Sequence, residues 1–548
     1  MRCPATRART GALLAAFLLS TTFIVACLPA HALPANQWAW ISGSNTPNAI
    51  GVYGTKGTPS TTNVPGGRFG AASWIDSAGN LWLFGGVIAS GGGLFRLNDL
   101  WEYSPAAGTW TWVSGSNALN PAGIYGTKGT PSTANAPGGR QLAASWTDAT
   151  GNLWLFGGWG LDSGSGEGPL NDLWEYSPSA GTWTWVSGSD MQSTIGTYGT
   201  KGAGSPTNVP GGRTNSAFWK DSAGNLWVFG GHGCDSTQCG LGGNPSLIMS
   251  LNDLWKYDPS AATWTWVSGS NVVNASGVFG SRGVPAATNM PGGRGGATAW
   301  IDCNNNLWLF GGSDAYVDSA GFFVTDGYQN DLWEYSTSVG VWTWVSGSNT
   351  TAPASAVYGT QGIASVSNVP GGRGHAAGWT DLGGNLWLFG GFGLDSAGST
   401  SYLNDLWEYS PSAGTWEWVS GSNTVNAAGA YGIRGTSSAS NVPGARSDST
   451  SWTDSAGNFW LFGGDGYAAP GTPIPLFNDL WEYTPATNAS SGQSGCPSAC
   501  KHERGDGETD RDEPRHGHRE YGYHEREHHS QDCDDDDDRE HEGGRDRR

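Results

Sequence analysis

Short segments in which large apolar residues alternate with small or polar ones recur along most of this chain. In Thr109–Ser114, Trp110 and Trp112 alternate with Thr111 and Val113, and a period of two is typical of a β-strand. Three other segments precede this one in a fixed order, and each is also predicted to be one strand. They are Arg68–Asp76 (rich in Ala), Asn80–Gly86 (Asn-Leu-Trp-Leu-Phe-Gly-Gly) and Asn98–Tyr103 (Asn-Asp-Leu-Trp-Glu-Tyr).

Tight-turn sequences separate these segments. Asp76–Asn80 reads Asp-Ser-Ala-Gly-Asn and Ser104–Gly108 reads Ser-Pro-Ala-Ala-Gly, and in each the Gly can adopt a positive φ. Four antiparallel strands joined by such turns make one blade of a β-propeller. The unit appears six times with a period of roughly 75 residues. The sequence therefore predicts an all-β fold, a six-bladed propeller over residues 33–486.

The two ends of the repeated region complement each other. The sixth unit has its first three strands, and no Trp-x-Trp strand follows them, whereas a Trp-x-Trp strand at Trp38–Ser42 precedes the first unit. We expect Trp38–Ser42 to pair with the strand at Asn478–Tyr483. That pairing would complete the last blade and remove its open edge.

The residues at the ends of these strands resemble the kelch repeat. Gly85 and Gly86 follow an apolar strand, and Tyr103 is followed by Trp110 seven positions later. The same pair recurs at Tyr176 and Trp183, Tyr257 and Trp264, Tyr335 and Trp342, and Tyr409 and Trp416. The likeness covers nearly all of residues 37–485. It implies a propeller of the kind found in kelch binding modules, in the central domain of galactose oxidase and in bacterial sialic acid mutarotases.

Tryptophan is far above its ordinary frequency, with 31 residues in the chain. All but one of them occupy repeated positions. A ligand site does not need the same residue in every blade, whereas packing between blades does, so we expect these side chains to form the core. Trp159, directly after Gly157 and Gly158, has no repeat counterpart and is a candidate platform for a ligand.

Net charge and the N-terminal segment restrict partners and location. A net charge of −20 argues against nucleic acid as a partner, because phosphate binding requires a basic surface.

Residues 1–32 are predicted to be a signal peptide, with three Arg, an apolar stretch over residues 12–26 and a small-x-small site at Ala30–Ala32. A lipobox-like sequence ending at Cys27 leaves a lipid anchor as the alternative. We expect a secreted, periplasmic or cell-surface protein without a transmembrane segment.

The segments beyond the repeats differ in composition. Residues 487–500 form a Ser/Gly/Cys-rich linker, and residues 501–548 are rich in Asp, Glu, Arg and His and should be disordered, because they cannot bury a core. Such a tail either binds divalent metal loosely or only keeps the protein soluble. The candidate metal ligands are His516, His518, His524, His528 and His529. The candidate disulfides are Cys234 with Cys239 and Cys496 with Cys500.

One face of the predicted propeller, here called the upper face, carries the long loops after the second and fourth strands. The loop after the second strand varies most, and variable loops on a rigid frame are where binding usually resides. One repeated Arg begins each innermost strand. These residues either attract an anion such as a sialic acid carboxylate or pair with repeated carboxylates such as Asp99 and Asp172, and their sixfold repetition favours the pairing. They are Arg68, Arg140, Arg213, Arg294, Arg373 and Arg446.

The position two residues after each Arg breaks the sixfold symmetry. Its residues are Gly70, Leu142, Asn215, Gly296, His375 and Asp448. A functional site must break the symmetry, so Asn215, His375 and Asp448 are the polar candidates for binding. A second cationic set lies in the loop after the fourth strand, and its stems are expected to cover aromatic surface. It consists of Lys56, Lys128, Lys201, Arg282 and Arg434, with Gln361 as the exception.

An enzymatic role would need more chemistry than the repeats display. The repeated region contains only two histidines, His232 and His375, which argues against the copper-radical chemistry of galactose oxidase, and no cofactor is expected. No catalytic triad, phosphate loop or zinc spacing is present in the sequence. We expect a non-catalytic scaffold that binds a glycan or a protein through its upper face. The alternatives are a carbohydrate-directed enzyme, since a mutarotase needs only a few polar groups, and metal sequestration by the tail.

Overall fold

The computed structural model describes residues 35–239, 249–317, 323–350, 352, 354–467 and 474–486. Antiparallel β-strands make up the secondary structure of this part of the chain, so the all-β prediction is confirmed. The strands form six sheets of four or five strands, with several shorter ribbons beside them. The sheets are numbered here in the order of the sequence units.

Each sheet reproduces the four strands that the motifs predict. Sheet one has the order β2 (Ala72–Ile75), β3 (Leu81–Phe84), β6 (Leu100–Ser104) and β7 (Thr109–Ser114). The equivalent strands are β9 (Ala144–Thr147), β10 (Leu153–Leu161), β11 (Glu167–Ser177) and β12 (Thr182–Ser187) in sheet two; β14 (Ala217–Lys220), β15 (Leu226–Gly233), β16 (Met249–Asp258) and β17 (Thr263–Ser268) in sheet three; β18 (Thr298–Ile301), β19 (Leu307–Phe310), β22 (Leu332–Ser336) and β23 (Val341–Ser346) in sheet four; β25 (Ala377–Thr380), β26 (Leu386–Phe389), β29 (Leu406–Ser410) and β30 (Thr415–Ser420) in sheet five; and β33 (Thr450–Thr453), β34 (Phe459–Phe462), β36 (Leu480–Thr484) and β1 (Gln37–Ser42) in sheet six.

Shorter strands lie beside these sheets, most of them in the connection between the second and third strands or directly before the innermost strand, whereas β31 follows β30 and pairs with β1. They are β4 (Val87–Ser90), β5 (Gly93–Arg96), β8 (Arg140–Gln141), β13 (Arg213–Thr214), β20 (Ser313–Val317), β21 (Phe323–Tyr328), β24 (Arg373–Gly374), β27 (Phe392–Leu394), β28 (Thr400–Tyr402), β31 (Ser437–Ser438), β32 (Arg446–Ser447) and β35 (Asp465–Gly466). These short strands differ in length from sheet to sheet, and they carry the residues of the candidate site.

The turns form as their composition predicts. Between β2 and β3, Asp76 Oδ1 accepts hydrogen bonds from the backbone N–H groups of Ala78 and Asn80, at 2.9 Å each. Gly79 adopts a φ of 80°, which a residue with a side chain rarely takes. An Asp that bonds its own turn fixes the register of the hairpin, in which Trp74 lies opposite Trp82.

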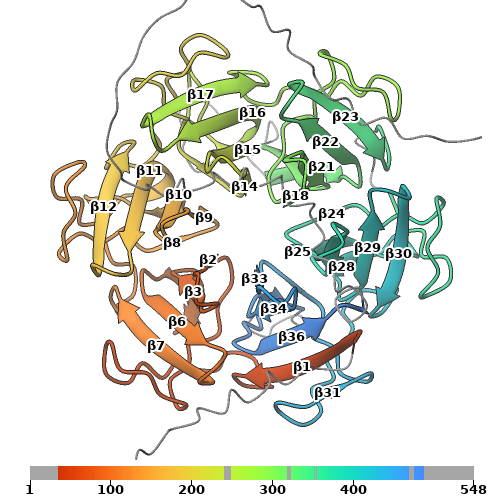
Figure 1. The fold of residues 1–548 in the computed structure, drawn as a ribbon, viewed down its shortest axis with the longest axis horizontal. Helices are drawn as coiled ribbons and strands as arrows, with labels where there is room; N and C mark the ends of the chain where they lie inside the picture. Colours follow the sequence, from red (N-terminus) through yellow and green to blue (C-terminus); the bar gives the residue numbers. More distant parts are fainter. Residues whose placement is uncertain are drawn as a thin grey trace, which may run out of the picture. The chain divides into compact units, whose positions relative to one another are not determined.

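The six sheets surround a common centre (Figure 1). Their innermost strands contact one another in the cyclic order β2, β9, β14, β18, β25, β33 and back to β2. The pairing predicted from the two ends of the sequence is present. Strand β1, at the red end of the colour scale, runs antiparallel to the blue β36, with Trp38 opposite Tyr483 and Trp40 opposite Trp481.

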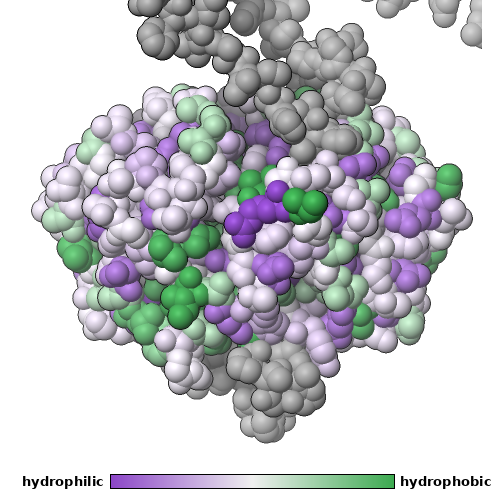
Figure 2. All heavy atoms as spheres, turned by 90° about the horizontal axis from the view of Figure 1, so that it is seen from below, coloured by the Kyte–Doolittle hydropathy of each residue, from purple (hydrophilic) through white to green (hydrophobic). Residues whose placement is uncertain are grey.

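The core lies between neighbouring sheets. Phe84 of sheet one packs on Trp183 of sheet two with ring centroids 5.5 Å apart, and Trp82 packs on Tyr176 at 6.1 Å. Six hydrophobic clusters of this kind each draw residues from two adjacent sheets. The expectation that the repeated Trp residues form the core is confirmed. On the outside drawn in Figure 2, apolar residues form small separate patches among more polar ones.

Candidate functional site

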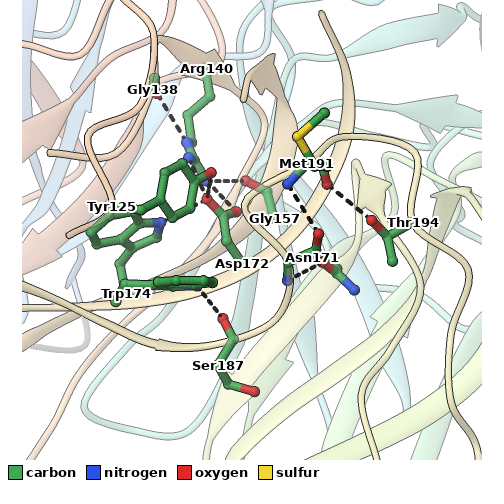
Figure 3. A network of polar contacts seen from close by, with 12 residues as sticks. Tyr125, Gly138, Arg140, Gly157, Asn171, Asp172, Trp174, Ser187, Met191 and Thr194 are labelled. Carbon is green, nitrogen blue, oxygen red and sulfur yellow. Dashed lines mark hydrogen bonds and ion pairs between the residues drawn. The ribbon is translucent and has the colours of Figure 1, made fainter. Parts of the chain in front are cut away.

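The repeated Arg residues are buried and paired with repeated aspartates. Arg140 bonds both carboxylate oxygens of Asp172, each at 2.7 Å, and donates to the backbone carbonyls of Gly138 and Gly157 (Figure 3). Such a two-pronged geometry uses most of the donors of the guanidinium group. The other pairs are Arg68 with Asp99, Arg213 with Asp253, Arg294 with Asp331, Arg373 with Asp405 and Arg446 with Asp479.

Each of these aspartates also accepts hydrogen bonds from aromatic side chains. Asp172 Oδ2 accepts from the hydroxyl of Tyr125 and from Nε1 of Trp174, each at 2.7 Å. Burial alone would lower the pKa of Arg140, but the charge of Asp172 and its hydrogen bonds raise it. Phe279 replaces the tyrosine in the fourth unit, where it packs on Trp333. The structure therefore shows that the repeated arginines pair with aspartates. Their charges are neutralised inside the repeated set of sheets, here called the frame.

The second cationic set also stabilises the frame. Lys128 Nζ lies 4.2 Å from the ring centroid of Trp185 and donates a hydrogen bond to the backbone carbonyl of Gly188 at 2.7 Å. The expectation that these side chains cover aromatic surface is confirmed for all five cations. The others are Lys56 on Trp112, Lys201 on Trp266, Arg282 on Trp344 and Arg434 on Trp40.

The symmetry-breaking positions form a continuous ring of backbone hydrogen bonds, here called the mouth ring. It consists of Gly70, Leu142, Asn215, Gly296, His375 and Asp448, all with φ between 50° and 67°. The N–H of each residue donates to the carbonyl of its counterpart in the preceding unit, and the N–H of Gly70 donates to the carbonyl of Asp448 at 2.9 Å. Since these bonds use only backbone groups, they leave the side chains free to differ.

A cavity of ≈ 330 Å³ lies at the mouth ring and is lined by all six of its residues. Further residues of its wall come from the innermost strands and are mostly Ala, Ser and Thr, with Phe218 as the largest. Side chains of the mouth ring pack against the ring residue of the preceding unit. A Cβ added to Gly70 would lie 3.1 Å from the side chain of Leu142, and one added to Gly296 would lie 2.7 Å from Nε2 of His375. Glycine at these two positions therefore makes room for the next side chain of the ring.

His375 and Asp448 form a hydrogen-bonded pair in the mouth ring. Nδ1 of His375 lies 2.8 Å from Oδ1 of Asp448, and the side chains are 19% and 14% exposed. Burial alone would lower the pKa of His375, but the charge of Asp448, its hydrogen bond and the charge of Asp465 together raise it. Two of the three polar residues selected from the sequence are thus in direct contact.

A second set of unequal residues surrounds the mouth ring and was not selected from the sequence, apart from Trp159. These residues directly follow the Gly-Gly pair of each unit and pair with the residue that precedes the mouth ring, as Asp465 pairs with Ser447. They are Val87, Trp159, His232, Ser313, Phe392 and Asp465. A comparison of the six copies at this position would have identified all of them.

Asp465 extends the His375–Asp448 pair outward. Its Oδ1 accepts a hydrogen bond from Ser447 Oγ at 2.6 Å, and its Oδ2 accepts one from the hydroxyl of Tyr402 at 2.9 Å. Burial raises the pKa of Asp465 to about 6, and the nearby charge of Asp448 contributes to the rise. Both carboxylates therefore occupy one partly buried region.

Aromatic rings from sheets four and five complete this region. Phe392 lies between Tyr402 and Tyr328, with ring centroids 5.1 and 5.7 Å away. The charge of Asp448 contributes, after burial, to a raised pKa of Tyr328. We call this group the mouth cluster; it consists of His375, Asp448, Asp465, Tyr402, Phe392 and Tyr328.

The remaining candidates lie elsewhere around the mouth. Asn215 is a member of the mouth ring, between Leu142 and Gly296. Trp159 is partly exposed, and its Nε1 donates to Glu167 at 2.7 Å, while Glu167 also pairs with Arg96 at 2.9 Å. Trp159 and Glu167 belong to β10 and β11 of sheet two and Arg96 to β5 of unit one, so this group comes from other units than the His375–Asp448 pair.

The predicted disulfide between Cys234 and Cys239 is present. Cys496, Cys500, the signal segment with Cys27 and the five tail histidines lie outside the described residues. Among the residues that the structure describes, no group of three or more His, Cys, Asp or Glu is placed to hold a metal ion. No helix in the described ranges is long and apolar enough to cross a membrane.

Comparisons with known proteins add no relative to this description. No protein-family model matches the chain, and no curated protein is significantly similar to it.

Proposed function

We propose that the chain is a six-bladed β-propeller of the kelch type. The six sheets, the cyclic contacts of their innermost strands and the circle of backbone hydrogen bonds through the mouth ring support this assignment. The pairing of β1 with β36 supports it further, because a strand from one end of the repeats would then close the last blade. Residues 33–486 would form this domain, after a cleaved signal and before an acidic tail.

We further propose that this propeller is an exported, non-catalytic scaffold that binds a glycan at the mouth cluster. One observation carries the proposal: polar and aromatic side chains from three sheets converge beside a cavity of ≈ 330 Å³, at positions where the frame requires no particular residue. Aromatic faces and carboxylate oxygens suit the apolar faces and hydroxyl groups of a sugar. A concave site of this size favours a sugar chain over a flat protein surface.

The test is a glycan-array screen of the purified full-length protein, with a protein pull-down in parallel. The double variant His375→Ala, Asp448→Ala is expected to lose binding. Leu142→Ala, which changes the same ring on its apolar side, is the matched control and should retain it. Capture of a protein partner that the double variant still binds would overturn the glycan assignment.

An enzyme acting on sugars is the second candidate, and the imidazole–carboxylate pair favours it. Asp448 orients His375 through Nδ1, which leaves Nε2 of His375 as a group able to exchange a proton with a bound sugar. NMR exchange spectroscopy on the sugar identified by the array would measure its anomerisation. Acceleration by the wild type that the double variant lacks would show that the mouth is an active site and would overturn the non-catalytic proposal.

A further inference from the structure

The charges at the mouth cluster do not balance. Asp448 and Asp465 contribute two carboxylates, and His375 contributes one imidazole. The six repeated arginines cannot compensate, because each is bonded to its own aspartate inside the frame. Above a pH of about 6, where Asp465 is ionised, the cluster therefore has an excess of one negative charge even when His375 is protonated. Such a site attracts cations and repels acidic sugars.

Hydrogen-bond acceptors are in excess as well. Asp448 uses Oδ1 for His375, and no other described side chain bonds its Oδ2. His232 is 5% exposed, and its Nε2 has no partner among the described residues. Burial and the charge of His375 lower the pKa of His232 to about 4, while a hydrogen bond to the backbone of Ser313 opposes this. His232 is therefore neutral, and its free Nε2 is an acceptor.

The imidazole of His232 adjoins the mouth ring, with its Nε2 buried. The imidazole of His232 lies against Gly295, where an added Cβ would be 2.8 Å from Nε2, and the imidazole of His375 lies against the next residue, Gly296. These two histidines, from sheets three and five, thus flank one dipeptide of unit four. The rings of Phe392 and Tyr328 pack on each other, and Tyr328 lies against Gly374, the residue before His375; aromatic rings attract a cation at their faces.

We propose that the mouth cluster selects ligands carrying a protonated primary amine, and that its glycan is an amino sugar with a free amino group. An ammonium group supplies positive charge and three N–H donors, and the site supplies negative charge, the Oδ2 acceptor of Asp448 and nearby aromatic rings. This inference rests on the proposed glycan-binding function. It is opposite in charge to the anionic ligand that was one of the two alternatives for the repeated arginines.

Calorimetry on the full-length protein with three tetrasaccharides tests the inference. The probes are tetramers of glucosamine, of N-acetylglucosamine and of galacturonic acid; the first two share a backbone and differ in the amine. The glucosamine tetramer should bind about tenfold tighter than its acetylated form, with the acidic tetramer weakest. Tighter or equal binding of the acetylated or acidic tetramer would overturn the amine inference and leave glycan binding intact. Binding of none would overturn both.

Two variants locate the effect. Asp448→Asn keeps the shape of the side chain and removes its charge, so the preference for the amine should fall severalfold while the acetylated tetramer binds as before. Leu142→Ala should leave the preference unchanged. Because a misfolded variant would lose all binding, the ratio of the two affinities is the readout. An unchanged ratio in Asp448→Asn would contradict the proposal.

Discussion

In each unit the repeated arginine and the mouth-ring residue lie two positions apart, and the first is constant whereas the second varies. The arginine that begins the innermost segment is the same in all six units and forms the same buried pair with an aspartate. The mouth-ring residue two positions later differs in almost every unit. Its conformation is held by backbone hydrogen bonds, so Gly, Leu, Asn, His and Asp all fit. Repetition marks what the frame needs, and variation marks what it leaves available for a ligand.

The largest expected effect is on the repeated side of this comparison. Asp172→Ala leaves the guanidinium of Arg140 buried without a partner, and we expect it to lower the free energy of unfolding by about 3–5 kcal/mol. Asp448→Asn, in the mouth ring, should cost less than about 1 kcal/mol, because its side chain is partly exposed. Denaturant titrations of both variants measure the difference. Equal losses would show that the mouth is also part of the frame.

Glycine substitutions at the mouth separate conformation from binding. Gly70→Ala and Gly296→Ala both place a side chain at a φ near 65°, and each should cost about 1–2 kcal/mol in unfolding experiments. Only Gly296→Ala displaces the imidazole of His375, so only this variant should weaken ligand binding, as measured by calorimetry. Equal binding by the two variants would mean that His375 does not touch the ligand.

The fifth unit breaks the symmetry away from the mouth, at a cost. Glu408 faces Glu417 across β29 and β30, where four other units have Thr and the sixth has Ala39 at the position of Glu417. Burial raises the pKa of Glu408 to about 7, and the charges of Asp381 and Glu417 add to the rise. A folded-state pKa above the ordinary value means that stability is greatest in acid and is lost as the pH rises through about 7.

Glu417→Thr should therefore stabilise the protein by about 1 kcal/mol near pH 8 and have little effect near pH 5, where Glu408 is largely protonated and uncharged. Denaturant titrations at the two pH values measure this. The equivalent Thr184→Glu in the second unit is the matched control and should destabilise at the higher pH. A pH-independent effect of Glu417→Thr would exclude the repulsion.

The smallest effect concerns the one incomplete copy of the arginine–aspartate network. Phe279→Tyr restores the hydroxyl that the other units direct at the aspartate and should stabilise by about 0.5–1 kcal/mol, while Tyr125→Phe should cost a similar amount. Thermal unfolding of the two variants compares them. A loss of stability in Phe279→Tyr would show that the fourth unit has repacked around Phe279.

Much of the frame is predictable from the sequence because the same residues recur at equivalent positions of the six units. The strands, the Asp76-type turns, the tryptophan core and the pairing of the two ends all depend on local pattern or on repetition. The choice between the two roles of Arg140 depends on whether its side chain is buried, which no local pattern gives. Asp465 was missed although the Gly-Gly pair aligns it with its counterparts, because the six copies were not compared at that position, whereas Tyr402 lies in a segment of unequal length where no motif aligns the copies. Their convergence on His375 appears only when the fifth and sixth units are brought together.

The pairing of β1 with β36 has a consequence for how the molecule is made. These strands lie at opposite ends of the repeats, and the hydroxyl of Tyr483 donates to Asn36, a residue 447 positions earlier. Because synthesis runs from the N-terminus, β1 remains unpaired until β36 has been synthesised, when most of the chain has left the ribosome. Contacts of such sequence separation form slowly, and an unpaired edge is prone to aggregate in the meantime. We expect nascent or truncated chains to require a chaperone until the last strand arrives.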